Sequence, residues 1–504
     1  MTPTVSAPTD IRPMLLPRRV TALTGPVQAD WFGAPEYWLA REVLQRGVAA
    51  VFLIAFLGAA LQFRALLGRD GMLPVPRFVA RVPFRAAPSV FHLHYSDRFF
   101  AAVCWAGVAL AGALVAGVDD AVPLWAATLA WLSLWLGYLS IVNVGQRWYG
   151  FGWESLLLEA GFLMMLLGND DIAPPVLTLW LLRWLLFRVE FGAGLIKMRG
   201  DPCWRDLSCL DYHHETQPMP GPLSWFFHHL PRPLHRVEVA GNHIAQLLVP
   251  FGLFAPQPVA SIAAAIVIVT QLWLVASGNF AWLNWLTILL AFSAVDHAAF
   301  ATVLPMPATP TPTATPGWFA ALVIAGTALT VVLSYWPVAN MVGHTQRMNA
   351  SFNALRLVNT YGAFGTVGRV RMEVVIEGTD AERITADTVW KEYGFSGKPG
   401  DPHRMPRQWA PYHLRLDWLM WFAALSPTYA QDWFRPLVAR LLRADRATLR
   451  LLGHNPFPDA APRYVRARLY EYRFTSWREL REDRRWWNRT LVGEYLPPVR
   501  RERA

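Results

Sequence analysis

Long apolar segments alternate with short polar ones through the first two thirds of the chain. A run of about 20 mainly apolar residues is long enough to cross a bilayer as a helix. Charged residues, glycines and prolines interrupt several of these runs, so each end is set only to within a few residues. The pattern predicts about nine spans, at residues 48–67, 99–118, 121–142, 154–168, 175–197, 239–256, 257–276, 280–304 and 317–336.

The character of the chain changes at residue 338, because residues 338–504 contain no apolar run long enough to span a bilayer. Apolar and charged residues alternate along 369–377, which is the pattern of a half-buried strand. A looser strand is expected at 464–474 and an amphipathic helix at 414–425.

We therefore expect a polytopic α-helical membrane protein of about nine spans, followed by a soluble, strand-rich α+β C-terminal domain. An N-terminal arm and interfacial segment would occupy residues 1–47. The transmembrane helical domain would cover 48–337, with an outward loop at 198–238, and the C-terminal domain 338–504. A linker rich in proline and threonine, at 306–316, separates the last two spans.

Composition agrees with a membrane protein, since 54% of the residues are hydrophobic and only 16% are charged, against about 25% charged in soluble domains. The net charge of +10 comes from scattered arginines, which favours contact with membrane lipid or solvated loops over nucleic acid. The N-terminus shows no apolar core before a cleavage site, so we expect no removable signal peptide. Tryptophans near expected span ends would form an interfacial belt: Trp148, Trp153, Trp282 and Trp285.

The orientation in the membrane is open at this stage. Arginines precede the first span at Arg12, Arg18, Arg19, Arg41 and Arg46, and follow it at Arg64, Arg69, Arg77, Arg81, Arg85 and Arg98. Because cytoplasmic loops carry the excess of basic residues, this count leans toward an outside N-terminus. A disulfide in the 198–238 loop would favour the opposite, since nine spans and an inside N-terminus place that loop and the C-terminal domain outside.

Three charged residues recur along the fifth expected span. Arg183, Glu190 and Lys197 follow one another at intervals of seven, and at 100° per residue they fall on nearly one stripe of a helix. A rise of about 1.5 Å per residue separates neighbours by roughly 10 Å, so they cannot pair directly. Glu154 and Glu159 in the preceding span are the expected partners.

Two interpretations of this stripe stay open. Ionisable residues inside a membrane are costly and usually face the interior of a helix bundle. In one interpretation, the stripe belongs to a salt-bridge network that fixes helix packing. In the other, Lys197 is a general base, with Glu190, Glu154 or Glu159 as its partners.

Two of the three cysteines, Cys203 and Cys209, follow this span closely. Their spacing permits a disulfide across a small loop, a pair of free thiols, or a redox or metal role, but it does not match the C-x-x-C redox motif. We expect Cys104 to be an apolar residue within a span.

Six of the 13 histidines lie between residues 198 and 243. The string DYHHETQP in this region lacks the H-E-x-x-H arrangement that places two histidines on one helix face. We therefore predict no metal site and no cofactor.

Long, distinctive strings occur in order along most of the chain. They are PEYWLAREVLQRGVAAVFLIAFLGAALQFRALLGRDGMLPVPRF (35–78), VNVGQRWYGFGWESLLLEAGF (142–162), FGAGLIKMRGDPCWRDLSCLDYHHETQPMPGPLSWFFHHLP (191–231), NTYGAFGTVGRVRMEVVIEGTD (359–380), WKEYGFSGKPGD (390–401) and HNPFPDAAPRYVRARLYEYRF (454–474). With these strings the chain closely resembles the lipase maturation factor family.

This resemblance implies a multi-span membrane protein whose C-terminal domain lies on the lumenal side. Animal members of the family reside in the endoplasmic reticulum membrane and help dimeric lipases fold and assemble. Lumenal loops and the C-terminal domain are implicated in client contact. A bacterial member would lie in the inner membrane and face the periplasm or the cell exterior.

A fainter similarity reaches the membrane domain of vitamin K-dependent gamma-carboxylase and the related HTTM proteins. There an AG pair, a lysine and a tryptophan recur at the end of a membrane helix, matched here by Ala193, Gly194, Lys197 and Trp204. The resemblance implies that Lys197 corresponds to the lysine that acts as base in the carboxylase.

The sequence therefore leaves three functions open. The first is a membrane-embedded maturation or folding factor for secreted or exported proteins, lipases in the family, that does no chemistry of its own. The second is a carboxylase-like membrane enzyme that uses the intramembrane lysine, and the third is a lipid or small-molecule transporter. For the first, we expect client contacts at Trp204, Tyr212, His213, Arg407 and Trp409.

Overall fold

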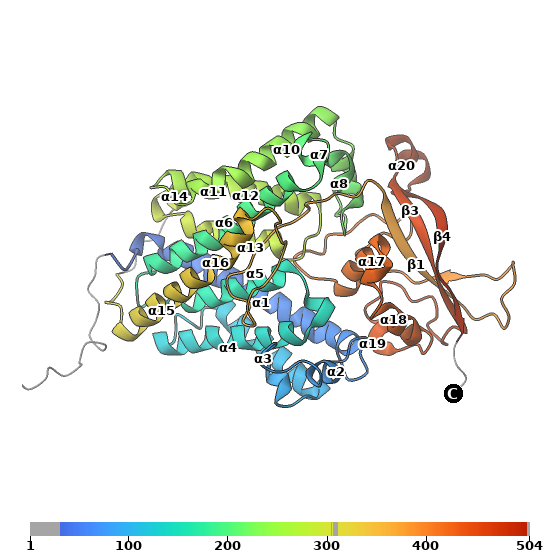
Figure 1. Cartoon of the computed structure of the whole chain (residues 1–504), viewed down its shortest axis with the longest axis horizontal. Helices are drawn as coiled ribbons and strands as arrows, with labels where there is room; N and C mark the ends of the chain where they lie inside the picture. Colours follow the sequence, from blue (N-terminus) through green and yellow to red (C-terminus); the bar gives the residue numbers. More distant parts are fainter. Residues whose placement is uncertain (1–30, 304, 306–310, 501–504) are drawn as a thin grey trace, which may run out of the picture.

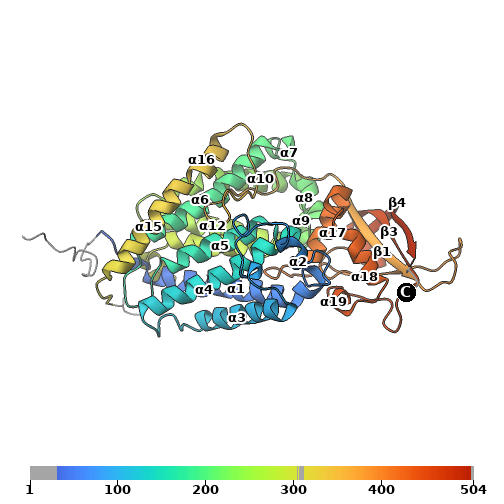
Figure 2. The same cartoon turned by 60° about the horizontal axis from the view of Figure 1, so that its bottom comes forward.

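The computed structural model describes residues 31–303, 305 and 311–500. Most of the expected N-terminal arm, part of the proline-rich linker and the last four residues lie outside the described residues. The chain forms a helix bundle at one end and a smaller domain built on a β-sheet at the other (Figure 1). A second view shows the same two parts, with α17 (Arg415–Leu425) between the bundle and the sheet (Figure 2).

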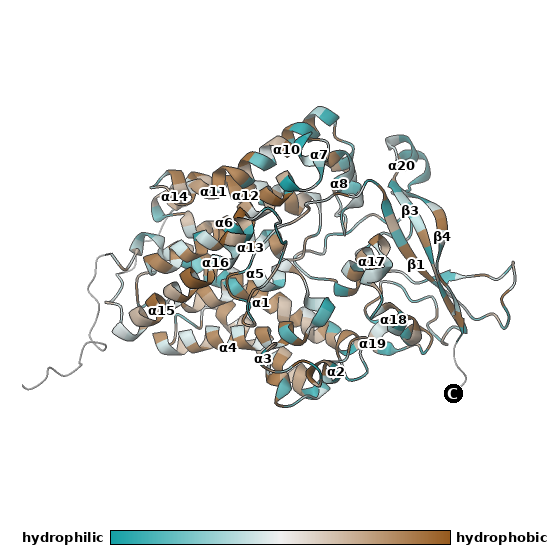
Figure 3. Ribbon diagram, viewed as in Figure 1, coloured by the Kyte–Doolittle hydropathy of each residue, from teal (hydrophilic) through white to brown (hydrophobic). Residues whose placement is uncertain are grey.

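Five helical segments among the described residues are long and apolar enough to cross a membrane. Figure 3 shows hydrophobic residues along these helices and a more mixed hydropathy along the ribbon of the C-terminal domain. The five are α1 (Trp38–Leu66), α3 (Asp97–Val115), α4 (Leu124–Val144), α12 (Val259–Ser277), and α15 (Gly317–Leu333) continued by α16 (Tyr335–Val342).

The other four expected spans coincide with helices that are shorter or carry more charge, so the count of nine is not confirmed. These helices are α5 (Gly152–Met165), α6 (Val176–Arg199), α10 (Arg232–Leu247) with α11 (Val249–Gly252), and α13 (Leu283–Ala291). Short helices lie in the connections between the long helices of the bundle, namely α2 (Val75–Val79), α7 (Pro202–Arg205), α8 (Leu210–Thr216), α9 (Ser224–His228) and α14 (His297–Ala301).

Two glycines let neighbouring helices approach α1 closely. A methyl group on Gly107 of α3 would lie 2.3 Å from the Phe56 ring, and one on Gly161 of α5 would lie 2.5 Å from the Phe52 ring. Both phenylalanines of α1 are buried. Small residues at such contacts allow close helix packing where no hydrophobic effect drives helices together within the bilayer.

The C-terminal sheet has four antiparallel strands in the order β2-β1-β3-β4. The strands are β1 (Arg371–Thr379), β2 (Lys391–Glu392), β3 (Tyr464–Phe474) and β4 (Trp487–Arg500). Both predicted strands are present, and they pair with each other, Val374 opposite Leu469. One face of the sheet packs against α17 and α18 (Phe434–Leu441), which are followed by α19 (Arg446–Leu449).

The expectation of a half-buried first strand was wrong, because both faces of β1 are covered. Arg371 and Glu373, expected on the solvent side, are buried and form an ion pair of 2.6 Å. Lys398 lies 2.8 Å from the same carboxylate. Arg371 also donates to the carbonyl of Pro218 at 3.0 Å, so the loop after α8 covers the second face of the sheet.

The helix expected at 414–425 is present as α17, but it is buried on nearly all sides rather than amphipathic. It is wedged between the sheet and the helix bundle, so both of its faces meet protein. Its Trp418 ring lies 4.8 Å from the ring of Trp153 in α5.

Three of the four tryptophans expected in an interfacial belt lie instead beneath the C-terminal domain, and the fourth, Trp285, is partly buried. Trp148, Trp153 and Trp282 are each at most 8% exposed. The Trp148 ring packs 5.5 Å from that of Trp433, just before α18. The sequence prediction failed because the C-terminal domain docks on the end of the bundle where these residues lie.

A buried ion pair joins the two parts of the chain. Glu154 of α5 accepts hydrogen bonds from Arg415 of α17 at 2.5 Å and from the Tyr138 hydroxyl. The Arg415 guanidinium also donates to the carbonyl of Trp148 at 2.7 Å and lies 3.5 Å from the centre of the Tyr149 ring. The side chains of Glu154 and Arg415 are at most 1% exposed, so each charge depends on the other.

We expect Arg415→Leu to lower the stability of the protein by about 3–5 kcal/mol, because it leaves a buried carboxylate without its cation. Thermal unfolding of the full chain in detergent micelles measures this effect. Arg463→Leu is the matched control, because Arg463 forms an exposed pair of 3.0 Å with Glu382 and should contribute less than about 1 kcal/mol. Equal losses in the two variants would contradict the assigned role of Arg415.

Candidate functional site

The three charges of the expected stripe all lie on α6, and each meets a different element. Arg183 donates from Nε to the carbonyl of Ser293 at 3.0 Å, just beyond α13. Glu190 accepts a hydrogen bond of 2.6 Å from Gln271 of α12. All three stripe residues are buried. The stripe therefore connects α6 to several helices at once.

The partners expected for the stripe, Glu154 and Glu159, lie elsewhere. Glu154 pairs with Arg415, as described above. Glu159 pairs with Arg188 of α6, and its Oε2 accepts a hydrogen bond of 3.0 Å from the backbone N–H of Asn359. Arg188 faces away from the stripe. It follows Arg183 by five residues, which at about 100° per residue place it roughly 140° around the helix from Arg183. The prediction that α5 neutralises the stripe was wrong.

Lys197 is held by neutral groups of α10 and α7. Its ammonium donates to Asn242 Oδ1 at 2.7 Å and to Gln246 Oε1 at 2.9 Å. The ring of Trp204 lies 4.7 Å from Nζ, a distance at which the ring face attracts a cation. Lys197 is 5% exposed. Because its neighbours hold a cation and leave it little room, the geometry favours the packing interpretation over a general base.

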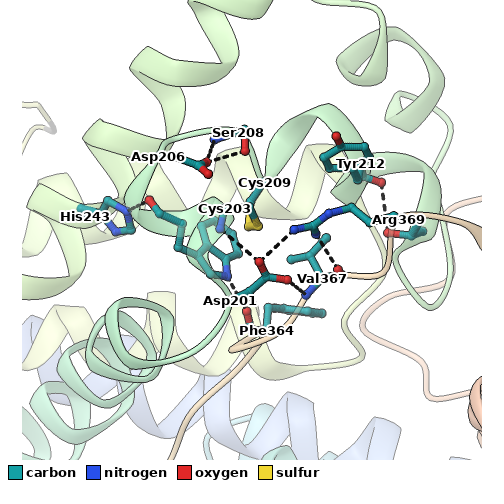
Figure 4. Close-up of a disulfide and its surroundings, with 12 residues drawn as sticks. Asp201, Cys203, Asp206, Ser208, Cys209, Tyr212, His243, Phe364, Val367 and Arg369 are labelled. Atoms are coloured by element: carbon teal, nitrogen blue, oxygen red, sulfur yellow. Dashed lines mark hydrogen bonds and ion pairs between the residues drawn. A yellow bond between two sulfur atoms is a disulfide. The ribbon is translucent and has the colours of Figure 1, made fainter.

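A small disulfide-closed loop follows Lys197 directly. Cys203 and Cys209 are joined by a disulfide, with Cα atoms 4.7 Å apart (Figure 4). Asp201 caps α7, and its carboxylate accepts the backbone N–H of Cys203 at 3.0 Å. A hydrogen bond of 2.8 Å from Arg369 to the same carboxylate holds the pKa of Asp201 below its usual range.

A segment of the C-terminal part, 364–369, lies over this loop. The Trp204 indole donates to the carbonyl of Phe364 at 2.7 Å, and the backbone N–H of Asp201 donates to the carbonyl of Gly365 at 2.7 Å. A methyl group on Gly200 would lie 2.0 Å from that same carbonyl oxygen, so the approach requires glycine. The loop is therefore clamped between α6 and a distant part of the chain.

Two of the five residues expected to contact a client are buried in this clamp. Trp204 and His213 are 3% and 8% exposed, so the structure contradicts a direct contact role for them. The His213 ring lies 4.9 Å from that of Phe364, and burial lowers its pKa to about 3. Tyr212 and Trp409 are partly buried, and Arg407 is exposed.

Sequence reasoning missed an aromatic surface shared by both parts of the chain. We call Phe226 of α9, Trp477 of α20 (Trp477–Asp483) and the neighbouring Trp486 the aromatic surface. The rings of Phe226 and Trp477 lie 5.9 Å apart and are 38% and 48% exposed. Beneath them, the Trp225 indole donates to the carbonyl of Thr475 at 2.9 Å. The strings PLSWFFHH and FTSWREL carried a signal, namely aromatic residues outside any predicted span.

Acidic side chains gather at the opposite end of the bundle, where Glu42, Asp120 and Asp170 come close enough to hold a metal ion. Arginines already occupy this cluster. Arg46 pairs with Glu42 at 3.4 Å and with Asp120, and Arg41 pairs with Asp170. The guanidinium groups thus supply the positive charge that a metal would bring.

Comparison with known proteins decides the family. Residues 39–302 match the lipase maturation factor transmembrane domain, and residues 357–497 match the lipase maturation factor C-terminal domain. Lipase maturation factor 1 from Homo sapiens is 38% identical over 514 residues, which cover 92% of this chain and 88% of the relative. The chain belongs to the lipase maturation factor family.

Other members of the lipase maturation factor family are similar over comparable lengths. Lipase maturation factor 1 from Bos taurus is 39% identical, over 93% of this chain and 90% of the relative. Lipase maturation factor 2 from Homo sapiens is 29% identical, over 92% and 82%. No solved structure matches the chain. Family membership and the five apolar helices together identify an integral membrane protein.

We expect the double variant Cys203→Ser/Cys209→Ser to have a free energy of unfolding about 2 kcal/mol lower than the wild type. The loss corresponds to the entropic contribution of closing so short a loop. Thermal unfolding in detergent measures the loss, and reductant should bring the wild type to the same value. Thiol labelling of the denatured protein should find only Cys104 before reduction and three cysteines after it. Three reactive thiols before reduction would contradict the disulfide.

Replacement of Lys197 by methionine should destabilise the protein by about 1–3 kcal/mol, because Asn242 and Gln246 lose a buried donor. The measurement is again thermal unfolding, with Lys391→Met as control, since Lys391 is exposed on the short strand β2. If Lys197 were instead a catalytic residue that lowers the stability of the protein, its replacement by methionine should raise that stability. A Lys197→Met protein more stable than wild type would therefore argue against the packing role.

Proposed function

We propose that this protein is a membrane-embedded maturation factor that assists the folding and assembly of secreted lipases. The observation that carries the proposal is the 38% identity to Lipase maturation factor 1 over 92% of the chain. The relationship extends through both the bundle and the C-terminal domain, so it covers the parts that a client would meet.

The proposal includes an outward C-terminal domain. The disulfide-closed loop and this domain lie at the same end of the bundle, where Arg369 binds Asp201 and the Trp421 indole donates to the carbonyl of Thr216 at 3.2 Å. Disulfides persist in oxidising compartments. This end would face the periplasm in a bacterium, or the lumen in an endoplasmic reticulum membrane. The nine-span count, with α5, α6, α10 and α13 also in the membrane, fits this orientation.

The aromatic surface is our candidate for client contact. Aromatic residues and arginine are enriched at protein interfaces, where they supply large contact areas. Arg407 is exposed and lines a small cleft together with Pro220 and Trp487, close to this surface. A maturation factor needs such a surface to hold apolar segments of an incompletely folded lipase, and it needs no reaction of its own.

The catalytic and transport alternatives receive no comparable support. Lys197, the residue on which a carboxylase-like reaction would depend, is held by Asn242, Gln246 and the Trp204 ring. Arg183 and Glu190 are likewise bonded to buried partners, Ser293 and Gln271. The charged stripe is therefore best explained by helix packing.

Deletion of the gene tests the proposed function. We expect the specific activity of exported lipases, measured as activity per mass of secreted enzyme, to fall in the deletion strain and to recover with the wild-type chain. The variant Phe226→Ser/Trp477→Ser should restore less activity at equal membrane abundance, because it removes two exposed aromatic contacts.

Leu425→Ser/Tyr429→Ser is the matched control, since these residues are 50% and 46% exposed in the C-terminal domain, as Trp477 is, but lie outside the aromatic surface. It should restore activity fully. If the deletion leaves the activity and amount of every exported lipase unchanged, the proposed function is wrong. If the two double variants restore activity equally, the function stands and the assigned surface is wrong.

A further inference from the structure

The connection between α1 and α3, together with the adjoining ends of both helices, carries an unneutralised basic surface. It consists of six exposed arginines, Arg64, Arg69, Arg77, Arg81, Arg85 and Arg98. Within the described part of the chain, none of the six has a carboxylate at ion-pair distance, whereas Arg41, Arg46 and Arg188 in the bundle all do. Exposed arginines without partners on one connection are free to bind an anion.

A cavity of about 550 Å³ opens within this basic surface. Arg69 and Arg77 line it together with His92, His94 and Tyr95, and apolar side chains that include Leu93 complete the wall. Among the described residues, those that line the cavity include no aspartate or glutamate. The volume falls in the range of small-molecule sites. The guanidinium groups of Arg69 and Arg77 are donors suited to an anion, whereas the Tyr95 hydroxyl already donates to Asp97 at 3.0 Å.

The cavity lies at the level where a bilayer presents its headgroups. α1 ends at Leu66 and α3 begins at Asp97, and both helices are apolar enough to span the membrane. In a bilayer that both helices cross, the segment between them would lie at or just outside the boundary of the hydrocarbon core. Two large apolar side chains are exposed there, Phe84 at 52% and Leu93 at 85%. Basic residues beside exposed apolar ones are typical of a surface that contacts anionic lipid.

We propose that this cavity binds the phosphate of an anionic phospholipid headgroup. The guanidinium groups of Arg69 and Arg77 would donate to the phosphate oxygens, since the planar fork of arginine matches that geometry. Leu93 and Phe84 would contact the glycerol and the upper acyl chains. The other arginines of the basic surface would meet neighbouring headgroups and add attraction that salt weakens.

This assignment also explains why so many arginines follow the first span. Their number alone would place this connection in the cytoplasm. Yet it lies at the same end of the bundle as the C-terminal domain, since Gln62 near the end of α1 donates to the carbonyl of His413 at 2.8 Å. Lipid binding gives these arginines a role that does not depend on the orientation rule.

The test uses the full chain purified in a neutral detergent and titrated with dioleoyl phosphatidylglycerol or dioleoyl phosphatidylcholine. Binding is read by native mass spectrometry and by the rise in unfolding temperature. We expect preferential binding of phosphatidylglycerol. Arg69→Gln/Arg77→Gln should weaken it by roughly 25-fold, about fivefold for each arginine near a membrane surface. Arg69→Lys/Arg77→Lys should retain most of the affinity, and higher salt should lower it in the wild type.

Arg443→Gln/Arg450→Gln is the matched control, because both arginines are exposed in the C-terminal domain and their loss should leave lipid binding unchanged. Circular dichroism confirms that each variant is folded. Equal binding of the two lipids, or unchanged affinity in Arg69→Gln/Arg77→Gln, overturns the proposal. So does glycerol 3-phosphate that binds as tightly as the lipid, since the ligand is then a free phosphate. Tighter binding of polyglutamate would instead indicate an acidic protein partner.

Discussion

The buried ion pair between Glu154 and Arg415 fixes how the two parts of the chain fit together. Either charge alone, away from water, would cost several kcal/mol, so each part carries a group that only the other can satisfy. Glu159 repeats the principle, because it accepts both the Arg188 guanidinium and the backbone N–H of Asn359. α5 thus presents two carboxylates, and residues from the C-terminal part help to satisfy both. The C-terminal domain is a structural continuation of the bundle rather than an appended module.

This docking determines which side chains are exposed at the end of the molecule that carries the C-terminal domain. After its last span the chain returns across α5 and α6, lies over the disulfide-closed loop, and only then enters β1. The aromatic surface depends on that path, because Phe226 comes from the bundle and Trp477 from the C-terminal domain. The buried bond from Trp225 to the Thr475 carbonyl holds the two sources together. The surface that we propose for client contact would therefore exist only when the whole chain is folded.

The sequence predicted elements well where one periodic pattern determines them. The strand at 464–474 was found at its observed bounds, and five apolar runs became helices of spanning length. The sequence was a poor guide to which side chains contact one another in the folded protein. Glu154 was assigned to a stripe one helix away, while its arginine lies 261 positions along the chain. Trp148 and Trp204 read as exposed for the same reason, since polarity and spacing do not reveal which distant segment will cover a residue. The aromatic surface was missed because its members are separated by about half the chain.

Charge on the connection between α1 and α3 is arranged differently from charge in the rest of the bundle, and this bears on how the protein is held in its membrane. At one end of the bundle, carboxylates and arginines satisfy one another, as Arg46 does with Asp119 at 2.5 Å. On the basic surface, six arginines are exposed, and no carboxylate of the described residues lies at ion-pair distance from them. An exposed guanidinium has little effect on stability whether or not it is paired, so the stability of the fold does not explain why these arginines are present. Beside exposed Phe84 and Leu93, however, the same group is held where a headgroup phosphate would lie. The unpaired arginines are therefore best explained as groups that bind lipid headgroups, whereas the buried ion pairs hold the two parts of the chain together.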